Sequence, residues 1–461
     1  MELYIFLLFC ISFFLLFLRR SSSAHRLPPG PFNFPIVGSL HRLGSHPNQS
    51  LFELAKTYGP LMTLRLGYVT AVIASSAEMA KQVLLTHEEA FSDRTVPDAV
   101  TSQPNYEWTL GWSVGDVRWR NRRRLCTTQL FTVQRLNSLQ HLRQQKVQQL
   151  IQHIEKQRVS GSQVNIGEVT FATALNLISS TIFSTDIVDP EFSTAHEFKD
   201  LVWRIMDDSS KPNLSDYFPM LKRFDLQGMR KHIRQSYMRL HAIFDTLIDK
   251  RMELRASDSK ARSGDFLDVL LDQCEENQAH FTRQNIKPLI LDLFIAGSDT
   301  SALTTEWAMA ELLRKPEVLQ KTKRELMEVI GSRRAVQESD IDELPYLQAV
   351  VKETLRLLFC CLTKPKKKWK YAATPYPRTL RFIDSGLDFR GRDFKYIPFG
   401  AGRRICTGLP LAVRMVHLML ASMIRSFDWK LPQGINPQDI DMQEQFGTTL
   451  RKAVPLCAIP V

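Results

Sequence analysis

The segment from Phe399 to Gly408 constrains the fold of this 461-residue chain more than any other part of its sequence. Its letters are FGAGRRICTG, and it stands directly before an apolar stretch from Leu409 to Ile424. Glycines permit tight turns and let the backbone approach another group closely. The free N–H groups and the positive dipole end of a helix favour an ionised sulfur. The sequence therefore predicts that Cys406 lies in a glycine-supported loop at the start of a long buried helix.

Chance does not account for this loop. Its five spaced identities, F-x-x-G-x-R-x-C-x-G, should occur by accident on the order of 10⁻⁴ times in a chain of this length. That number disfavours a glycine-rich loop around an inert cysteine. A cysteine nucleophile is a further alternative, but it needs a neighbouring base. The nearest histidine in the sequence, His417, lies on the following helix, where packing or solvent exposure is the simpler expectation.

A second unusual segment is the apolar stretch from Leu289 to Leu313, which has the length of a long helix. Inside it stand six residues, AGSDTS, that begin at Ala296. The small pair Ala296 and Gly297 would let a flat ring approach the helix closely. Asp299 and Thr300 need a reason to stand in an apolar helix. The structural alternative is that such hydroxyls bond carbonyls of their own helix.

Composition excludes several classes of protein. Seven cysteines are scattered without regular spacing, so the chain has neither a disulfide framework nor the pattern of a zinc site. The formal net charge is +12, but seven of the cations, with no acidic residue among them, lie between Leu358 and Arg381, and without them the charge is +5. A local charge run of this kind is usually a solvated surface, so nucleic acid is not an expected partner.

The N-terminus predicts a membrane anchor. Residues 3–18 are sixteen uncharged and mostly apolar residues in succession, which as a helix would extend about 24 Å against a hydrocarbon core of about 30 Å. Arg19 and Arg20 follow this run, and by the positive-inside rule they leave the rest of the chain in the cytosol. We therefore expect a transmembrane anchor at residues 1–20 and a proline-rich elbow at residues 21–40. A cleaved signal peptide is the alternative, but it would place unpaired thiols in an oxidising compartment.

The remaining sequence predicts one large globular unit that is mainly α-helical with a small β-sheet region. Residues 61–66 alternate apolar with polar, and residues 69–74 form a second β-prone run, which together are typical of a hairpin. From residue 120 to 355 most windows have helical periodicity. No linker or repeat follows the N-terminal region, so we expect a single domain over residues 41–461.

Taken together, these segments resemble the cytochrome P-450 family. The loop around Cys406 is similar to the cysteine-ligand loop of the family, with Thr407 where plant members often have proline. The A-G-x-D-T pattern is similar to the helix that lines the family's oxygen pocket. Segments at 294–300, 306–312 and 427–432 resemble the plant microsomal geraniol 8-hydroxylase-like group. The resemblance implies the cytochrome P-450 fold.

The resemblance also implies roles for individual residues around a haem b cofactor. Cys406 would be the axial ligand of the haem iron, while Thr300 and Asp299 would contact the oxygen or a water and supply protons. The residues expected to hold the haem propionates are Trp119, Arg123 and Arg404. The residues expected to pack around the haem are Phe399, Gly400, Gly402, Gly408, Ala296 and Gly297. The residues expected to form a structural cluster beneath it are Glu353, Arg356 and Arg381.

The implied function is that of a haem-dependent monooxygenase for a small lipophilic substrate, for which the group resemblance suggests a monoterpenoid. It would use O₂ and electrons from a separate NADPH-dependent reductase, since the chain has no strand–GxGxxG–helix fingerprint of its own. An acidic reductase would be attracted by a basic helix face. The arginines of that face are Arg118, Arg120, Arg122 and Arg124. The anchor would place the enzyme on the endoplasmic reticulum membrane with its catalytic domain in the cytosol.

One interval departs from the family. After Glu353 and Arg356, family members continue with a proline-rich stretch, strands and a P-E-R-F box, whereas residues 358–380 are strongly basic and only Arg381 and its successor resemble the box. Arg356 and Cys406 lie 50 positions apart, fewer than in family members. We hypothesise a deletion with foreign sequence inserted; a transcript with these codons intact would count against it. The alternative to an active enzyme is therefore a catalytically impaired or haem-free relic of the family.

Overall fold

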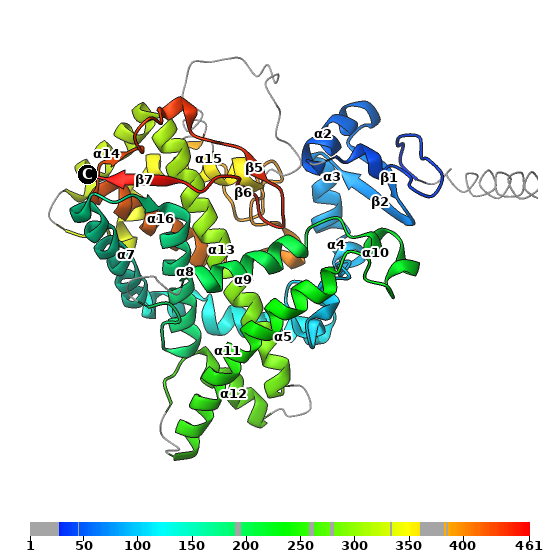
Figure 1. Ribbon diagram of the computed structural model, residues 1–461, viewed down its shortest axis with the longest axis horizontal. Coiled ribbons are helices and arrows are strands. Elements are labelled where there is room, and N and C mark those ends of the chain that lie inside the picture. The colour runs from blue at the N-terminus through cyan, green and yellow to red at the C-terminus, as the bar shows by residue number, and fades with distance from the viewer. Residues whose placement is uncertain are drawn as a thin grey trace, which may run out of the picture.

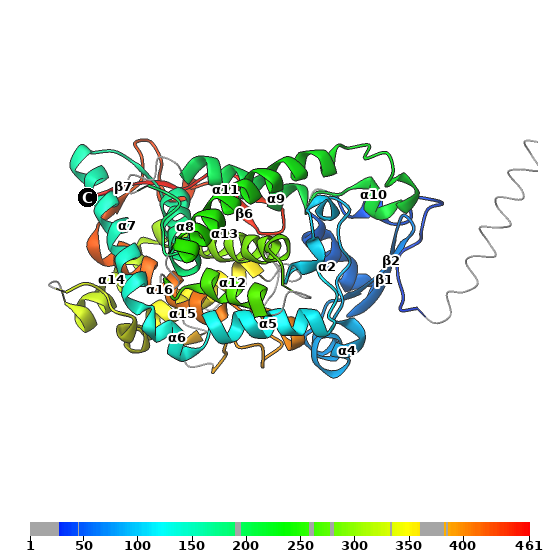
Figure 2. The ribbon, with the colours of Figure 1, turned by 90° about the horizontal axis from the view of Figure 1, so that it is seen from below.

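Helix α13, Arg283–Arg314, runs through the middle of the molecule (Figure 1, Figure 2). The side chain of Thr282 caps its start by accepting a hydrogen bond from the Asn285 N–H at 3.3 Å, and Pro316 follows its end. Most of its side chains are buried, so the predicted apolar stretch is a core helix that begins earlier than expected. The computed structural model describes residues 27–44, 46–189, 195–257, 262–276, 281–331, 334–359, 382–383 and 386–461.

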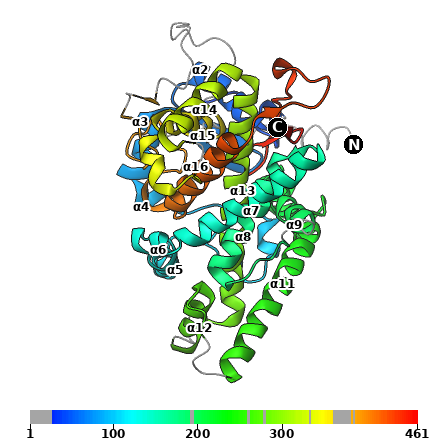
Figure 3. The same ribbon diagram turned by 90° about the vertical axis from the view of Figure 1, so that its left-hand side faces the viewer.

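Helices dominate the described ranges, as the sequence predicts. Their bounds are α2 Pro47–Tyr58, α3 Ala77–Lys81, α4 Glu88–Phe91, α5 Val117–Leu130, α6 Val133–Ser138, α7 Gln140–Ser160, α8 Ile166–Phe183, α9 Ala195–Asp208, α10 Leu214–Tyr217, α11 Met229–Ser257, α12 Phe266–Glu276, α14 Pro316–Ile330, α15 Pro345–Phe359 and α16 Leu409–Ser426. Helices α14, α15 and α16 lie at one end of the molecule, and α11 and α12 extend at the opposite end (Figure 1, Figure 3). Helices α8, α15 and α16 pack directly on α13.

The β-structure of the described ranges consists of small antiparallel sheets. Strands β1, Leu61–Leu66, and β2, Val69–Ala74, form the predicted hairpin, in which Leu61 lies opposite Ala74. The elbow packs on this hairpin, because Thr63 N–H donates to the Pro29 carbonyl at 2.9 Å. The remaining strands are β3 Val164–Asn165, β4 Trp429–Lys430, β5 Glu444–Gln445, β6 Arg451–Lys452 and β7 Cys457–Pro460, which pair as β3-β7-β4 and β5-β6. The mainly α prediction with a small β region is thus confirmed.

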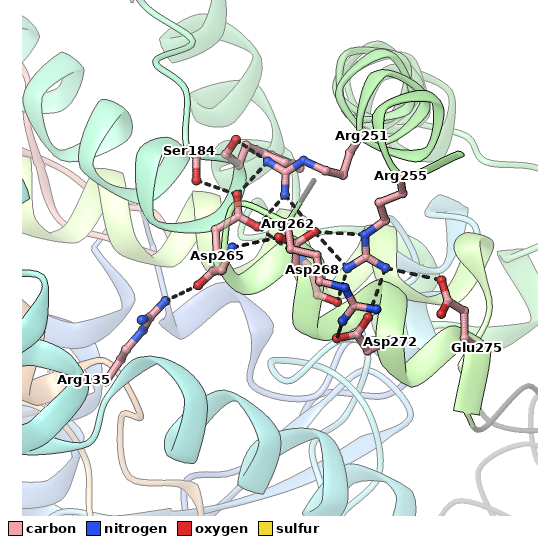
Figure 4. A network of polar contacts seen from close by, with 11 residues as sticks. Arg135, Ser184, Arg251, Arg255, Arg262, Asp265, Asp268, Asp272 and Glu275 are labelled. Atoms are coloured by element: carbon pink, nitrogen blue, oxygen red, sulfur yellow. Dashed lines mark hydrogen bonds and ion pairs between the residues drawn. The ribbon is translucent and has the colours of Figure 1, made fainter. Parts of the chain in front are cut away.

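A buried ion network joins α11 to α12 (Figure 4). Arg251 of α11 donates to both oxygens of Asp265 at 2.8 and 2.7 Å and lies 3.1 Å from Asp268. Arg255 donates twice to Asp268, at 3.0 and 2.8 Å, and the hydroxyl of Ser184 donates to Asp265. Burial alone would raise the pKa of Asp268, but hydrogen bonds from Arg255 and Arg251 outweigh it and lower the pKa. The network therefore holds the Asp268 carboxylate ionised.

Several predictions fall outside the described residues. These are the anchor at residues 1–20, the first part of the elbow, Arg381 and residues 360–380 of the atypical interval. Among the described helices, α8 and α16 are long and apolar enough to cross a membrane. Their apolar windows are 83% and 56% buried within the protein, so packing in the core explains their composition.

Candidate functional site

The cysteine loop is closed by its own backbone. The N–H of Cys406 donates to the carbonyl of Phe399 at 2.9 Å, and α16 begins three residues later at Leu409. The ring of Phe399 packs edge-to-face on Phe389 with a centroid separation of 5.9 Å. The structure thus places Cys406 at the start of a long helix, as the sequence predicts.

Two glycines of this loop are required by its geometry. Gly402 has a φ of 64°, and a Cβ there would lie 1.9 Å from the carbonyl oxygen of Leu84. Gly400 has a φ of 74°, which also favours glycine. Gly408 has an ordinary φ of −81°, and a Cβ there would lie 3.9 Å from the sulfur of Cys406. The backbone conformation at position 408 therefore does not itself require glycine.

The sulfur of Cys406 lies among hydrogen-bond donors. Its side chain has accessible surface, although protein atoms crowd the wider surroundings of the sulfur. Burial raises the pKa of the Cys406 thiol; the N–H groups of Gly408 and Leu409 and the charge of Arg123 oppose this rise but do not cancel it. The expectation that the helix start ionises the sulfur is therefore incomplete. An ionised sulfur here needs a further positive charge, such as that of a bound metal ion.

Trp119 lies buried between the two arginines that were expected to hold propionates. The guanidinium of Arg404 lies 4.1 Å from the centre of the Trp119 ring, and that of Arg123 lies 5.5 Å away. Arg123 also donates to the carbonyl of Ile405, next to the cysteine. The donors of Arg404 reach the carbonyls of Ser92, Leu110 and Ser113 at 2.8, 3.2 and 2.7 Å. The three residues meet beside Cys406, and their contact with propionates stays a prediction.

The AGSDTS segment of α13 has two kinds of contact. Ala296 is exposed within a largely buried helix, and the Thr300 hydroxyl donates to the Ala296 carbonyl at 2.6 Å. A Cβ on Gly297 would lie 2.8 Å from the side chain of Ile178, so glycine at this position allows α8 to pack closely on α13. Sequence reasoning assigned the small residues to a ring contact alone. The helix contact is a second reason for Gly297.

Both carboxylate oxygens of Asp299 are held by residues that are distant in the sequence. The indole N–H of Trp203, in α9, donates to Oδ1 at 2.9 Å, and the hydroxyl of Thr449, between β5 and β6, donates to Oδ2 at 2.9 Å. Burial raises the pKa of Asp299 to about 6, against the two hydrogen bonds and the charge of Lys199. A carboxyl group with a pKa in this range can take up and release protons near neutral pH.

Asp292 is a site residue that sequence reasoning missed. Its Oδ2 accepts hydrogen bonds from the N–H groups of Leu110 and Gly111 at 2.6 and 2.9 Å. The carbonyl of Leu110 accepts from the side chains of Trp119 and Arg404, so this one peptide links α13 to the cluster beside the cysteine. Burial raises the pKa of Asp292 to about 6, while the two N–H groups oppose it. An acidic residue within an apolar stretch was the available signal.

Glu353 and Arg356 form the predicted pair on α15. Arg356 donates to both oxygens of Glu353 at 2.7 and 2.8 Å, and the Glu353 side chain is only 9% exposed. This burial distinguishes the pair from an ordinary surface salt bridge.

The expected basic face of α5 needs a correction at Arg122. This residue is buried, donates to the carbonyl of Glu107 at 3.0 Å and lies 4.8 Å from the ring centre of Trp108. It belongs to the inner stripe of the helix. The exposed arginines are Arg118, Arg120 and Arg124.

His417 does not have the properties of a base for Cys406. Burial lowers the pKa of His417 to about 4, and its Nδ1 bonds the Val413 carbonyl of its own helix at 2.7 Å. Its position is that of a packed core residue, which is one of the two expectations for it.

The donor set fits a haem group. Cys406 offers an accessible sulfur, and Ala296 offers accessible surface on a helix that packs against α16. Trp119, Arg123 and Arg404 place two cations and a ring beside the cysteine, which suits a flat cofactor that carries carboxylates. A cysteine thiolate is a known ligand of haem iron.

Comparison with known proteins agrees with this site. The chain matches the family model for cytochrome P-450 over residues 28–368 and 378–456. It is 43% identical to a geraniol 8-hydroxylase of Catharanthus roseus over 485 aligned positions that cover 98% of each chain. It is 43% identical to a geraniol 8-hydroxylase of Swertia mussotii, with 95% of this chain and 94% of the relative covered. It is 42% identical to a 7-ethoxycoumarin O-deethylase of Helianthus tuberosus, with 98% and 97% covered.

The longest of these alignments exceeds the 461 residues of the chain, so part of the relative has no counterpart here. The break in the family match, residues 369–377, lies inside the atypical interval. On both sides of this break the match extends over the cysteine loop, the α13 segment and the Glu353 pair. The chain therefore belongs to the cytochrome P-450 family of haem-thiolate monooxygenases, and within it to the group that resembles geraniol 8-hydroxylase.

Proposed function

We propose that this chain hydroxylates a small lipophilic substrate of the monoterpenoid type, with electrons from a separate NADPH-dependent reductase. The observation that carries the proposal is the accessible Cys406 at the start of α16, together with the titratable Asp299 on the adjacent helix α13. The identity of 43% to geraniol 8-hydroxylases supports the substrate class. Bound haem supplies the centre at which O₂ is split, with one oxygen atom entering the substrate and the other leaving as water.

The residues of the site divide this work among them. Cys406 would bind the iron, and Arg123 and Arg404 would hold the propionates, with Trp119 packed between their guanidinium groups. Asp299 would take up a proton at a carboxylate oxygen, and the hydroxyl of Thr300 would pass it toward the oxygen pocket. The other residues expected around the haem would pack against it. They are Phe399, Gly400, Gly402, Gly408, Ala296 and Gly297.

An exposed apolar surface supports attachment to a membrane. It spans the elbow, the β1–β2 hairpin and the α10 region, which lie at one end of the molecule (Figure 1, Figure 2). Its exposed side chains are Phe32, Phe34, Ile36, Val37, Tyr68, Val69, Val72, Leu214, Met220, Phe224 and Leu226. The N–H of Tyr68 donates to the Tyr217 carbonyl at 2.9 Å, which ties the hairpin to α10. Such a patch marks a membrane or partner contact. The proposed organisation of the chain is an anchor at residues 1–20, an elbow at 21–40 and a catalytic domain at 41–461.

The reductase would approach the basic end of α5. Arg118, Arg120 and Arg124 are exposed on this helix, and α5 also carries Trp119 and Arg123 of the site. Exposed cations increase the rate at which an acidic partner associates. This orientation would bring electrons to the cysteine side of the site, on the cytosolic face of the endoplasmic reticulum.

A second candidate is a catalytically impaired or haem-free relic. It is favoured by the break in the family match at residues 369–377 and by the unmatched part of the relatives. By the family resemblance, the missing piece would supply sheet strands, a wall of the substrate pocket and a further donor to a haem propionate.

One experiment separates the two functions. The full chain and a chimera that carries a geraniol 8-hydroxylase segment in place of residues 358–380 are each expressed with a reductase in microsomes and supplied with NADPH and geraniol. Hydroxylated product from the unaltered chain supports the enzyme. Product from the chimera alone supports the relic, and absence of product from both, with haem loaded, contradicts the proposed substrate class.

A further inference from the structure

The ring of Trp203 contacts two cations from different elements. The Nζ of Lys199, in α9, lies 4.1 Å from the centre of the Trp203 ring, and the guanidinium carbon of Arg451, in β6, lies 4.7 Å from it. Arg451 also pairs with Asp207 at the end of α9. The ring therefore has little freedom to turn, and its N–H is directed at Asp299.

The second donor to Asp299 is equally well anchored. Thr449 lies in the β5–β6 turn, where the hydroxyl of Thr448 donates to the Met206 carbonyl at 3.0 Å. The carbonyl of Leu450 accepts from the indole N–H of Trp307 at 3.0 Å. The turn is thus tied to α9 on one side and to α13 on the other.

The surroundings of Asp299 contain several charges but no direct ion pair in the part of the chain that the structure describes. Lys199 from α9 stabilises the carboxylate, and Glu306 from α13 opposes it. The other charged groups at this junction are Glu168 of α8, Asp200 and Asp207 of α9, and Arg451 and Lys452 of β6. The hydrogen bonds from Trp203 and Thr449 are therefore the direct support of the carboxylate.

We propose that Trp203, together with Thr449, is a positioning residue that holds Asp299 ionised and fixes the direction of its carboxylate during proton transfer. The inference rests on the proposed role of Asp299. Hydrogen bonds to a carboxylate favour its charged form. Because both oxygens are occupied and Thr300 bonds the Ala296 carbonyl, α9 and the β5–β6 turn would control when Asp299 exchanges a proton with the site.

The test uses four variants of the full chain. Trp203→Phe keeps an aromatic ring beside the two cations but removes the N–H, and Thr449→Val keeps the volume but removes the hydroxyl. Thr449→Ser retains a hydroxyl and should restore the native behaviour. Trp307→Phe is the matched control, because Trp307 also lies beside a cation, Lys452 at 4.8 Å, and donates to the same turn without contacting Asp299.

The first readout does not need turnover. Thermal unfolding is followed against pH for each variant with and without Asp299→Asn, and the difference gives the pH midpoint of Asp299 in the folded chain. Trp203→Phe and Thr449→Val should each move this midpoint upward by about one pH unit, since each loses one hydrogen bond to a charge. Thr449→Ser and Trp307→Phe should leave it in place. An unmoved midpoint in Trp203→Phe and Thr449→Val, or an equal movement in Trp307→Phe, overturns the proposal.

The second readout is the acidic limb of the pH profile of kcat, with product formed per NADPH consumed. In Trp203→Phe and Thr449→Val the acidic limb should move to higher pH together with the unfolding midpoint, and the product formed per NADPH should fall. The other two variants should keep the native limb and yield. A limb that stays in place while the midpoint moves contradicts a role in the reaction. A haem-loaded chain that makes no product contradicts the proposed function. The pH midpoint from unfolding still tests whether Trp203 and Thr449 hold Asp299 ionised.

Discussion

Asp268 and Asp299 are two buried aspartates that the protein uses in different ways. Their residues are 3% and 1% exposed. Asp268 lies between Arg251 and Arg255 in the network of Figure 4, and its pKa is lowered. Asp299 has an indole and a hydroxyl as donors, and burial raises its pKa to about 6. Two aspartates of similarly low solvent exposure are therefore a structural carboxylate in one place and a titratable carboxyl in the other.

The difference lies in the partners and in the depth of burial, because protein atoms enclose Asp299 more completely than Asp268. Guanidinium groups compensate a buried carboxylate fully and hold it charged, which fixes α11 against α12. Neutral donors compensate it only in part, so the proton can come and go. Titration near neutral pH is useful only in the second case.

The largest effect should follow Asp268→Asn. The change leaves the buried guanidinium groups of Arg251 and Arg255 without one of their charged partners, and it should lower the free energy of unfolding by about 3–5 kcal/mol. Denaturant unfolding of the full chain measures this. The kcat of the folded fraction should stay unchanged, because the network lies at α11 and α12, away from Cys406. A free energy of unfolding close to the native value would contradict the structural role of Asp268.

Asp299→Asn should have the opposite signature. Loss of the titratable group should lower kcat on the order of 10²-fold, as for other proton-transfer residues. The free energy of unfolding at pH 7 should fall by no more than about 1 kcal/mol, because an uncompensated buried charge is removed as well. Steady-state kinetics and denaturant unfolding of one preparation test both halves. If Asp299→Asn lost as much stability as Asp268→Asn and retained its kcat, both aspartates would have a structural role.

The two aspartates should also respond to pH in opposite directions. For Asp299 the folded pKa, about 6, lies above the ordinary value of 3.8, so the native chain should lose about 2 kcal/mol relative to Asp299→Asn as pH rises from about 4 to 6. For Asp268 the folded pKa is lowered. Its stabilisation should be complete above the ordinary value and disappear as pH falls below it. Unfolding curves across this range, for the native chain and each Asn variant, measure both signs.

The smallest effect should come from the rim of the same network. Arg262 pairs with Asp272 at 2.8 Å, but its side chain is 51% exposed. Arg262→Ala should therefore cost less than about 1 kcal/mol. A cost as large as that of Asp268→Asn would show that the network acts as one unit whatever the burial of its members.

Local features of this chain could be predicted from the sequence. The Cys406 loop and α16 are neighbours in the chain, and the hairpin and α13 follow from short-range periodicity. The partners of Asp299 could not be predicted in this way, because Trp203 and Thr449 lie 96 and 150 positions away. Only packing of α9 and the β5–β6 turn on α13 brings them together.

Gly402 is a second residue whose role depends on a distant contact, whereas the burial of Arg122 could have been predicted. The need for glycine at 402 comes from the carbonyl of Leu84, far earlier in the chain. Arg122, in contrast, stands three and four residues from the buried Trp119 and Cys126 on one helix stripe. That spacing could have identified it as an inner residue.

Cys406 is the proposed ligand of the haem iron, and the reduced, carbon monoxide-bound absorption spectrum of the full chain tests this bond most directly. We predict the long-wavelength band of a thiolate-ligated haem, its loss in Cys406→Ala and its retention in Cys274→Ala, a control on a partly buried cysteine of α12. Folded, haem-supplemented protein without this band, or a band that survives in Cys406→Ala, would contradict it.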